Sequence, residues 1–546
     1  MVTFNLADLF EMVCDAVPDR EAVVAGERRF TYRTLDERAN RLAHHLGSVG
    51  VKQGDHVGLQ LLNGTEYIEG MLACFKIRAV PINVNYRYVE DELRYLFDDA
   101  DLVSLIVHRQ FAERVAKIQP SLGLLRHVLI VEDGSDVPAS DQSAEYEAAL
   151  SSQSDARDFG PRSPDDIYCA YTGGTTGMPK GVLWRQEDIF FAGIGGGDPL
   201  HSGNVVERPE GLLERIYDVG LCALPTPPFM HVSAHWLVFS MLLGAGKIVI
   251  APGGRFEPKT IWRLVGDEGV NVLVIVGDAM ARPLADELEA SEGAYDTSAL
   301  MVVGSGGAVL SPDTKNRLTG VLPNAFIVDG FGSSETGTMG AQPSSAATGP
   351  AQALRFAPSD SIAVFDEKLQ RVRPGSGIVG RLARRGHIPL GYYKDPQKTA
   401  ETFIEVDGVR WVTPGDFAIV DDDGTIVLRG RGSISINTGG EKVYPEEVEG
   451  AIKEHPDVVD AVVVGVPDER WGERVVAVVQ GRDARAPTLD NLQAFLRARL
   501  AGYKVPRELV IVEKVERQPS AKPDYRWARE RALEALAGVP ETRDKA

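Results

Sequence analysis

Short apolar runs of β type alternate along most of this chain with segments whose apolar residues recur at helical spacing. Between Glu21 and about Val84 the order is strand, helix, strand, and the run EAVVAGERRFTY has the pattern of a hairpin around Gly26. Thr34 and Glu37 then form a capping-box pattern ahead of leucines and alanines at helical spacing. This alternation predicts a layered α/β domain.

The same texture continues beyond residue 160. Each later apolar run is followed by glycine or a polar turn, and loops at strand ends are where α/β folds usually place ligands. The runs are 167–171, 247–251, 272–276, 300–304 and 326–329. The segment 133–163 is rich in Ser, Asp, Gly and Ala and breaks the periodicity, so we expect a surface connection there.

The pattern changes again near residue 430. Pro445 precedes a helix-like segment, the runs AVVVGV and RVVAVV have the pattern of two strands, and a further helix is expected after Thr488. The 546 residues also exceed the roughly 250–300 at which a single core stops growing. We therefore expect a multi-domain protein, α/β to α+β overall. A large layered N-terminal domain, residues 1–430, precedes a smaller, mobile α+β domain, residues 431–546.

Charge and composition exclude several classes of protein. Lys plus Arg is 58 and Asp plus Glu is 78, a net charge of −20 that disfavours binding to nucleic acids or anionic membranes. The four cysteines lack CxxC spacing, which indicates reduced thiols. The N-terminus lacks a basic region, and the longest stretch without charged residues, 219–246, contains prolines and histidines. We expect a cytoplasmic protein without integral membrane association, and a homodimer stays open.

The strongest local motif is YTGGTTGMPKGV, residues 171–182. Glycines and threonines after an apolar strand offer backbone amides and hydroxyls that can surround a phosphate, and Lys180 adds a cation. The motif is not a Walker A loop, because Met178 and Pro179 separate Gly177 from the lysine. Taken by its glycines alone, the string would more often be a surface turn.

As a whole, this string resembles the phosphate-binding signature of the adenylate-forming superfamily, which includes acyl-CoA synthetases, peptide-synthetase adenylation domains and firefly luciferase. Further signatures of that superfamily follow in the expected order over nearly the whole chain. The resemblance implies that the loop binds ATP and that Thr176 also contributes to the metal site. The implied ATP-binding residues of this loop are Thr172, Gly173, Gly174, Thr175, Thr176, Gly177 and Lys180.

Three central segments extend the resemblance. In PPFMHV, His231 matches the family histidine beside the acyl pocket and the ATP site, and GSGGAVLS resembles the turn that packs against adenine. GFGSSETG resembles the aromatic-Gly-x-Thr-Glu motif, in which Phe331 would stack on adenine and Glu335 would hold Mg²⁺. Ser334 stands where threonine is commoner. The implied nucleotide-binding residues of these segments, with Asp329 directly before the last one, are Gly306, Gly307, Ala308, Asp329, Gly330, Phe331, Gly332, Ser333 and Ser334.

The segment WVTPGDFA resembles the family's Tyr/Trp-x-Thr-Gly-Asp motif. Asp416 would accept hydrogen bonds from both ribose hydroxyls, and Pro414 is an extra residue between Thr413 and Gly415. In RGRGSISINTGGEKVYPEEVE, Arg431 matches an arginine that contacts ribose or phosphate, and Ser433 falls at the hinge, where many relatives have Asp or Lys.

The C-terminal motifs complete the resemblance. Gly439 and Gly440 resemble glycines that line the pantetheine tunnel, although they could equally form a β-turn, and the implied CoA-binding residues are Gly439, Gly440, Glu441 and Lys442. In ERQPSAKPDYRW, Lys522 matches the family's catalytic lysine, with Ala521 in place of glycine. The catalytic candidates are Lys522, His231 and Glu335.

The resemblance implies a two-step ligation that uses ATP, Mg²⁺ and CoA. A carboxylate would attack the α-phosphorus of ATP to give an acyl-adenylate, and rotation of the small domain would then admit CoA. Runs such as GYYKDPQKTAETF look similar to actinobacterial fatty-acyl and steroid side-chain CoA synthetases, so we expect a bulky or long apolar acid. The candidates for the acyl pocket are His231, Trp236, Val303 and Ser305.

Three other functions stay open on the sequence alone. An acyl-AMP ligase would pass its product to a carrier protein, and a luciferase-like oxygenase would share every motif named. A nucleotide-binding homologue without catalysis is the alternative from another class. No carrier-protein domain follows Lys522, which disfavours a peptide-synthetase module.

Overall fold

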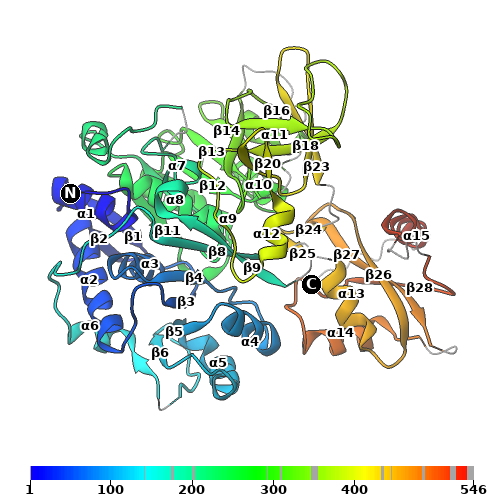
Figure 1. Cartoon of the computed structure of the whole chain (residues 1–546), viewed down its shortest axis with the longest axis horizontal. Helices are drawn as coiled ribbons and strands as arrows, with labels where there is room; N and C mark the ends of the chain where they lie inside the picture. Colours follow the sequence, from blue (N-terminus) through cyan, green and yellow to red (C-terminus); the bar gives the residue numbers. More distant parts are fainter. Residues whose placement is uncertain are drawn as a thin grey trace. The chain divides into compact units, whose positions relative to one another are not determined.

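The computed structural model describes residues 2–140, 142–173, 178–199, 203–291, 293–307, 310, 312–345, 355–431, 436–443, 445–482, 486–516 and 524–537. The chain divides into two compact units. The first comprises Met1–Tyr86, Arg94–Thr172 and Lys180–Gly430, and the second comprises Arg87–Leu93, Gly173–Pro179 and Arg431–Ala546. The predicted α/β class, with a large N-terminal part and a smaller C-terminal part, is confirmed (Figure 1).

The largest sheet in the described residues has eight strands, most of them parallel. Only its two edge pairs, β1 with β2 and β14 with β15, are antiparallel. In spatial order the strands are β15 (Gly337–Ser344), β14 (Phe326–Ser333), β13 (Val302–Ser305), β12 (Val272–Ile275), β10 (Cys222–Pro225), β11 (Lys247–Ile250), β1 (Glu21–Ala25) and β2 (Arg28–Thr31).

Both faces of this sheet are buried by helices, as a largely parallel sheet requires. Successive strand residues belong to different hydrophobic clusters: Val272 packs with α1 (Leu6–Ala16), α2 (Tyr32–Ser48), α3 (Thr65–Lys76), α7 (Gln186–Ala192) and α8 (Val232–Leu243). Its neighbour Leu273 packs with α9 (Pro258–Asp267), α10 (Gly277–Ala290) and α11 (Pro312–Val321). The carboxyl ends of the strands are thereby left to carry loops.

A second sheet of the first unit is parallel throughout. Its strands in spatial order are β4 (Val80–Asn83), β3 (His56–Gln60), β5 (Leu102–His108), β6 (His127–Val131) and β7 (Ala144–Glu145). The nearby helices are α4 (Glu90–Asp99), α5 (Ala112–Ile118) and α6 (Tyr146–Ser151).

The hairpin expected around Gly26 is confirmed, since β1 and β2 flank that glycine at φ +61°. The cap expected at Thr34 is wrong: α2 begins at Tyr32, and the Thr31 hydroxyl accepts the backbone N–H of Thr34. The segment 133–163 is also more than a surface connection. It contains β7 and α6, because Tyr146 and Leu150 give it a short buried face.

Among its described residues, the large N-terminal part contains two further sheets. The first contains β16 (Arg355–Phe356), β23 (Ile426–Arg431), β22 (Asp416–Val420), β18 (Gly380–Arg384), β21 (Val409–Val412) and β20 (Phe403–Val406), with β17 (Ile362–Phe365) beside β18. The second contains β19 (Gly391–Tyr392), β9 (Pro179–Arg185) and β8 (Ile167–Gly173). The helix α12 (Pro396–Thr402) follows β19.

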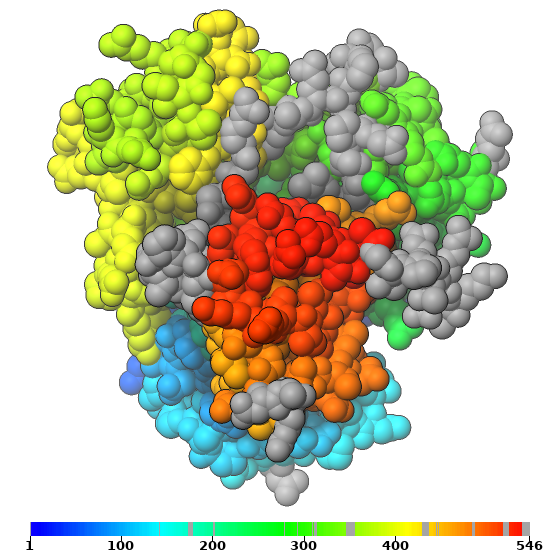
Figure 2. Space-filling view, turned by 90° about the vertical axis from the view of Figure 1, so that its right-hand side faces the viewer, coloured from blue at the N-terminus to red at the C-terminus, as the bar shows by residue number. Residues whose placement is uncertain are grey.

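The C-terminal unit has its own sheet and core. The hairpin of β26 (Val458–Asp468) and β27 (Gly472–Gly481) joins β24 (Ile436–Thr438), β25 (Glu441–Val443) and β28 (Glu508–Val512). The helices α13 (Pro445–Lys453) and α14 (Leu489–Arg497) pack on one face, and α15 (Tyr525–Ala537) packs on the other. In Figure 2, the red atoms, which include α15, lie over the orange atoms of the same unit. The helices predicted at Pro445 and after Thr488 are thus confirmed.

None of the helices in the described ranges is long and apolar enough to cross a lipid bilayer. All four cysteines are buried and unpaired. Burial raises the pKa of Cys14 to about 12 and that of Cys222 to about 11, so these thiols stay protonated at neutral pH.

Candidate active site

The strand that carries Lys180 lies beside a segment from much later in the chain. β9 pairs antiparallel with β19, so that Val182 lies opposite Tyr392 and Leu183 lies opposite Gly391. Three residues beyond β19, Asp395 contacts Lys180 across a sequence separation of 215 residues. The sheet therefore joins the predicted phosphate lysine to a segment to which sequence reasoning gave no role in the site.

Lys180 forms an ion pair with Asp395. The side chains are 19% and 24% exposed, so the pair is partly shielded from water. Asp395 also caps α12, because its Oδ1 accepts the backbone N–H of Lys398 at 2.8 Å. Burial would raise the pKa of Asp395, but the hydrogen bonds from Lys180 and Lys398 outweigh burial and lower it. Asp395 is therefore a carboxylate at neutral pH.

Glu335 lies in the turn between β14 and β15, and the same late segment holds it. The Tyr392 hydroxyl donates a hydrogen bond of 2.9 Å to Glu335 Oε1. Within the turn, the Thr336 hydroxyl accepts the backbone N–H of Ser333 at 3.0 Å, and Trp184 Nε1 donates to the Ser334 carbonyl at 2.9 Å. The turn that carries Glu335 is therefore held by a hydrogen bond within it and by one from Trp184.

Arg384 supports the same turn from β18. Its Nη1 donates to the carbonyls of Thr336 and Thr338 at 2.5 and 2.6 Å. Burial lowers the pKa of Arg384 to about 10, which still leaves the guanidinium charged at neutral pH. The positive charge of Arg384 therefore lies beside the backbone of the turn that carries Glu335.

Two glycines permit this close packing. A Cβ on Gly181 would lie 2.7 Å from the ring of Tyr171 and 2.9 Å from Cys169 Sγ. Gly337 has φ +68°, and a Cβ there would collide with the Ala192 carbonyl. Any larger residue at either position would push the segments apart.

Asn83 connects two of the predicted motifs. Its Oδ1 accepts the backbone N–H of Tyr171 at 2.8 Å, while its Nδ2 donates to the carbonyls of Tyr171 and Met230 at 2.8 and 2.7 Å. The strand that precedes the glycine-rich loop is thereby linked to the residue before His231. Sequence reasoning missed this buried asparagine, since nothing local distinguishes it from the other polar residues of INVNYRY.

His231 is half-buried at the N-cap of α8. His235, one turn later, is buried: the Tyr168 hydroxyl lies 2.9 Å from its Nδ1, and its Nε2 lies 3.2 Å from the Tyr67 hydroxyl and close to the Phe229 carbonyl. Burial lowers the pKa of His235 to about 3, so this imidazole is neutral at physiological pH. His235 is a structural histidine, and His231 is the one that is half-exposed.

The residues predicted near adenine lie at the ends of β13 and β14. A Cβ on Gly306 would lie 3.5 Å from the Gly330 carbonyl, which places these two backbones side by side. Phe331 packs on Phe356 with ring centroids 6.0 Å apart and nearly parallel planes. Asp329 is buried and forms an ion pair of 2.7 Å with Lys315, so its carboxylate is already neutralised.

The other residues predicted to bind the nucleotide in this part of the chain lie in strands or in the turns next to them. Gly307 has φ +81°, Gly332 lies at a register shift of β14, and Ser333 ends that strand. Asp416 is buried at the start of β22, directly after Gly415 at φ +100°. Thr172 is half-buried near the end of β8, and Gly173 is its last residue.

The four acyl-pocket candidates do not all face the same way. Trp236 belongs to the hydrophobic cluster that contains α8, and a Cβ on Gly193 would lie 2.8 Å from its ring. Val303 belongs to the cluster on the opposite face of the sheet, and the Ser305 hydroxyl accepts the backbone N–H of Gly277 at 3.0 Å. The structure therefore does not bring Val303 next to Trp236.

In the C-terminal unit, Gly439 and Gly440 form the two-residue turn between β24 and β25. Both have positive φ, +59° and +83°, as tight hairpin turns of this length require. Lys442 lies in β25, and Glu441 is buried and forms an ion pair with Arg87 within the same unit. The turn and β25 therefore lie at one edge of the small sheet.

Several predicted residues lie outside the described ones: Gly174, Thr175, Thr176, Gly177, Ala308, Ser433 and Lys522. Arg431 is described only as the last residue of β23. Among the described residues, no group of three or more His, Cys, Asp or Glu side chains is arranged to hold a metal ion. Glu335 is thus the single carboxylate that the motifs assign to a metal.

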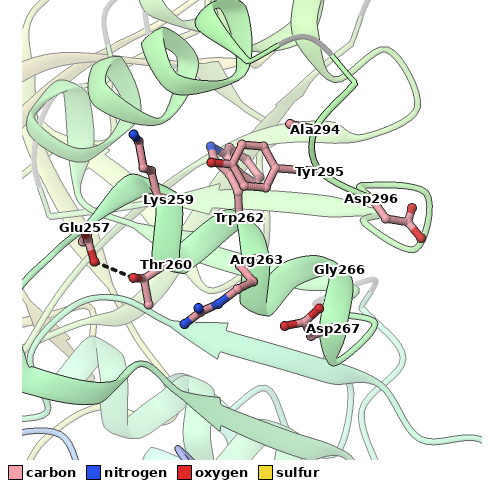
Figure 3. A pocket seen from close by; sticks show the side chains of 10 residues that line it. All are labelled: Glu257, Lys259, Thr260, Trp262, Arg263, Gly266, Asp267, Ala294, Tyr295 and Asp296. Atoms are coloured by element: carbon pink, nitrogen blue, oxygen red, sulfur yellow. Dashed lines mark hydrogen bonds between the residues drawn. The ribbon is translucent and has the colours of Figure 1, made fainter.

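A separate surface cavity of about 790 Å³ lies between α9 and the loop at 294–296 (Figure 3). Its lining carries both charge signs, from Lys259 and Arg263 and from Asp267 and Asp296, and Thr260 donates to Glu257 at 2.5 Å. None of the predicted site residues lines this cavity.

Sequence comparison identifies related proteins. Residues 10–393 match the AMP-binding enzyme family, and residues 447–522 match the AMP-binding enzyme C-terminal domain. The chain is 49% identical over 537 residues to a 3-oxocholest-4-en-26-oate–CoA ligase of Rhodococcus rhodochrous, covering 97% of this chain and 96% of that one. It is 46% identical over 538 residues, with the same coverage, to a medium/long-chain-fatty-acid–CoA/3-oxocholest-4-en-26-oate–CoA ligase of Mycolicibacterium smegmatis.

Structural comparison confirms the fold. A double mutant of o-succinylbenzoate CoA synthetase from Bacillus subtilis superposes with a TM-score of 0.78 at 20% identity, covering 96% of this chain and 98% of that chain.

Proposed function

The chain belongs to the AMP-binding enzyme family, and we propose that it is an ATP-dependent acyl-CoA ligase. It activates an apolar carboxylic acid as an acyl-adenylate, transfers the acyl group to CoA, and releases AMP and pyrophosphate. The observation that carries the proposal is the segment 391–395, which contacts both Lys180 and Glu335. Two side chains suited to phosphate and to a metal thereby share one neighbourhood.

The first half-reaction brings two anions together. A carboxylate oxygen of the substrate attacks the α-phosphorus of ATP, a new P–O bond forms, and the bond to pyrophosphate breaks. Lys180 binds the phosphate groups, and Lys522 contacts the attacking carboxylate and an α-phosphate oxygen. Positive groups held at developing charge typically contribute a factor of about 10²–10³ in rate.

Glu335 is suited to hold Mg²⁺. Its carboxylate is half-buried, Tyr392 fixes Oε1, and no described residue hydrogen-bonds to Oε2, so one oxygen can face a cation. Hard cations such as Mg²⁺ take carboxylate oxygens as ligands. When bound, Mg²⁺ supplies charge neutralisation to the triphosphate.

In the second half-reaction, the thiolate of CoA attacks the acyl carbonyl carbon, a C–S bond forms, and AMP leaves with the former anhydride oxygen. We assign the CoA-facing surface to the turn at Gly439 and Gly440 together with Glu441 and Lys442. Rotation about Ser433 brings this surface to the acyl-adenylate and moves Lys522 away.

The substrate class is a long-chain fatty acid or a steroid side-chain acid. The names of the relatives support it, because they act on 3-oxocholest-4-en-26-oate and on medium- to long-chain fatty acids. We retain His231 and Trp236 as residues of the acyl pocket, since both belong to the region of α8.

The direct test is release of AMP by the purified protein with ATP and Mg²⁺, a C16 fatty acid, a steroid side-chain acid or acetate, with and without CoA. The expected result is AMP and acyl-CoA from the two bulky acids and little from acetate. Acyl-AMP that accumulates without responding to CoA would indicate a ligase for a carrier protein. Oxygen consumption would indicate an oxygenase, and the absence of pyrophosphate with every acid would support a non-catalytic protein.

Replacing Lys522 with alanine separates the two half-reactions. We expect Lys522→Ala to lower the rate of acyl-AMP formation by at least about 10²-fold and to leave thioester formation from supplied acyl-AMP largely intact. Single-turnover measurements of each half-reaction give the two rates. Equal losses in both halves would contradict the assigned role.

A further inference from the structure

We propose that Asp395 is the counterion of Lys180 before the nucleotide binds. The phosphate groups of the nucleotide then displace Asp395 from Lys180. This inference rests on the proposed function, in which Lys180 binds phosphate. The ion pair between the two residues is the observation behind it. Lys180 cannot direct its ammonium fully at a phosphate oxygen while Asp395 holds it.

Asp395 keeps its position without the help of Lys180. Its other oxygen accepts the backbone N–H of Lys398 at 2.8 Å, at the start of α12. The next residue, Pro396, occupies the first turn of that helix and restricts the backbone there. The carboxylate is therefore fixed by its own helix, so an anion that binds Lys180 must compete with it.

The neighbouring carboxylates have other partners. Asp99 accepts the Tyr171 hydroxyl at 2.8 Å. Asp101 accepts the Tyr393 hydroxyl at 2.8 Å and forms an ion pair of 2.7 Å with Lys394. Asp395 is thus the carboxylate in this group that contacts the phosphate lysine, and Asp101 offers a matched control.

Competition of this kind weakens the apparent affinity for phosphate. The apparent affinity equals the intrinsic affinity multiplied by the fraction of molecules in which Lys180 is available. Partly exposed ion pairs are weak, which sets the size of the effect at about two- to fivefold. A multiply charged polyphosphate gains enough from the loop and the lysine to open the pair. A singly charged anion gains less, so the counterion favours nucleotide over simple anions.

The test uses the full-length protein and inorganic tripolyphosphate, without acid substrate, CoA or Mg²⁺. Asp395→Asn has nearly the same shape as aspartate and keeps an oxygen for the Lys398 N–H, but it removes the charge. We expect it to bind tripolyphosphate about two- to fivefold more tightly in titration calorimetry. Asp395→Ser, which also caps helices well, should show the same gain.

Two controls isolate the pair. Asp101→Asn removes a nearby negative charge that contacts Lys394, so its affinity should change by less than the effect at Asp395. In a Lys180→Ala background, Asp395→Asn should give no more gain than Asp101→Asn does, because the ion pair is gone and only general repulsion of the anion remains. Unchanged or weaker binding by both Asp395 variants would overturn the inference, as would an equal gain from Asp101→Asn.

The same titrations separate this inference from the proposed function. If Lys180→Ala binds tripolyphosphate as well as the unmodified protein does, the phosphate role of Lys180 fails, and the counterion inference fails with it. If Lys180→Ala loses binding but neither Asp395 variant gains, the phosphate role stands and the counterion inference alone is wrong.

Discussion

The orientation of Glu335 depends on one hydroxyl group. Tyr392 donates to Glu335 Oε1 at 2.9 Å, while the adjacent Tyr393 donates to Asp101 at 2.8 Å. These two tyrosines have the same chemistry and lie next to each other, yet they serve different carboxylates. Tyr393 can therefore serve as a control when the contribution of the Tyr392–Glu335 hydrogen bond to Mg²⁺ binding is measured.

We predict that Tyr392→Phe raises the Mg²⁺ concentration needed for half-maximal AMP formation by about tenfold. The reason is that a hydrogen bond to a charged group is worth about 1.5–3 kcal/mol, and its loss frees the carboxylate to adopt other rotamers. The measurement is the Mg²⁺ dependence of AMP release at saturating ATP. Tyr393→Phe should leave this dependence nearly unchanged, and equal shifts in both variants would count against a specific contact.

At the scale of elements, the hairpin of β24 and β25 depends on its turn. Gly439 has φ +59°, and a Cβ there would lie 2.6 Å from the Trp471 ring. The backbone N–H of Gly439 also donates to the Trp471 carbonyl at 2.8 Å. Both the conformation and the space at this position therefore require glycine.

We predict that Gly439→Ala lowers the stability of the C-terminal unit by about 1–3 kcal/mol, because the added methyl group strains the backbone and displaces Trp471. Hydrogen exchange of the β24–β27 amides reports this local loss. Gly450→Ala is the matched control: Gly450 lies in α13 with open space around it, so alanine should stabilise the helix by about 0.5–1 kcal/mol. Similar protection in both variants would rule out the strain.

Helix starts show how local the sequence signal is. The start of α14 at its cap Thr488 and the start of α13 at Pro445 follow from residues within one turn, and the sequence predicted both helices. The cap of α2 was misplaced by three residues, because Thr31 and Thr34 are both plausible caps and only the backbone conformation distinguishes them. The Asp-Pro pair at Asp395 is likewise a helix-start signal, but it says nothing about Lys180.

At the scale of the whole molecule, burial sets the charge state of several histidines. His45 and His127 lie 3.0 Å apart between their Nε2 atoms, so one imidazole donates to the other and protonating both is unfavourable. Burial and the neighbouring His45 lower the pKa of His127 to about 4. Burial also lowers the pKa of His45, His56, His108 and His235.

We predict that this histidine pair makes the protein sensitive to mild acid. Between pH 6.5 and about 4 the unfolded chain binds a proton at His127 that the folded chain excludes, so the free energy of unfolding falls as the pH falls. His127→Gln removes this titration, and its unfolding midpoint should drop less than that of the unmodified protein over the same range. Thermal melts of both proteins at several pH values give the difference between their unfolding midpoints. The effects of other titrating groups such as Glu69 are the same in both proteins and cancel in this difference. Parallel curves would contradict the prediction.

The class of fold, the family and the positions of the motifs could be predicted from the amino-acid sequence alone. Alternating apolar periodicity and short strings such as YTGGTTGMPKGV are local, so they can be recognised without knowing which segments meet. The sequence could not determine the partners of the motif residues. Asp395 lies 215 residues from Lys180 and Tyr392 lies 57 from Glu335. The pairing of β9 with β19 brings the first two together, and the packing of β19 near the β14–β15 turn brings the second two together.

The faces of the strands were also decided by the tertiary structure. Val303 and Trp236 are both apolar and both lie in or beside the large sheet, so the sequence allowed either to line an acyl pocket. Because successive residues of a strand point to opposite faces, the register of β13 assigns Val303 to the helices on the other side. Contacts of this kind arise from packing over long sequence separations, which no local pattern encodes.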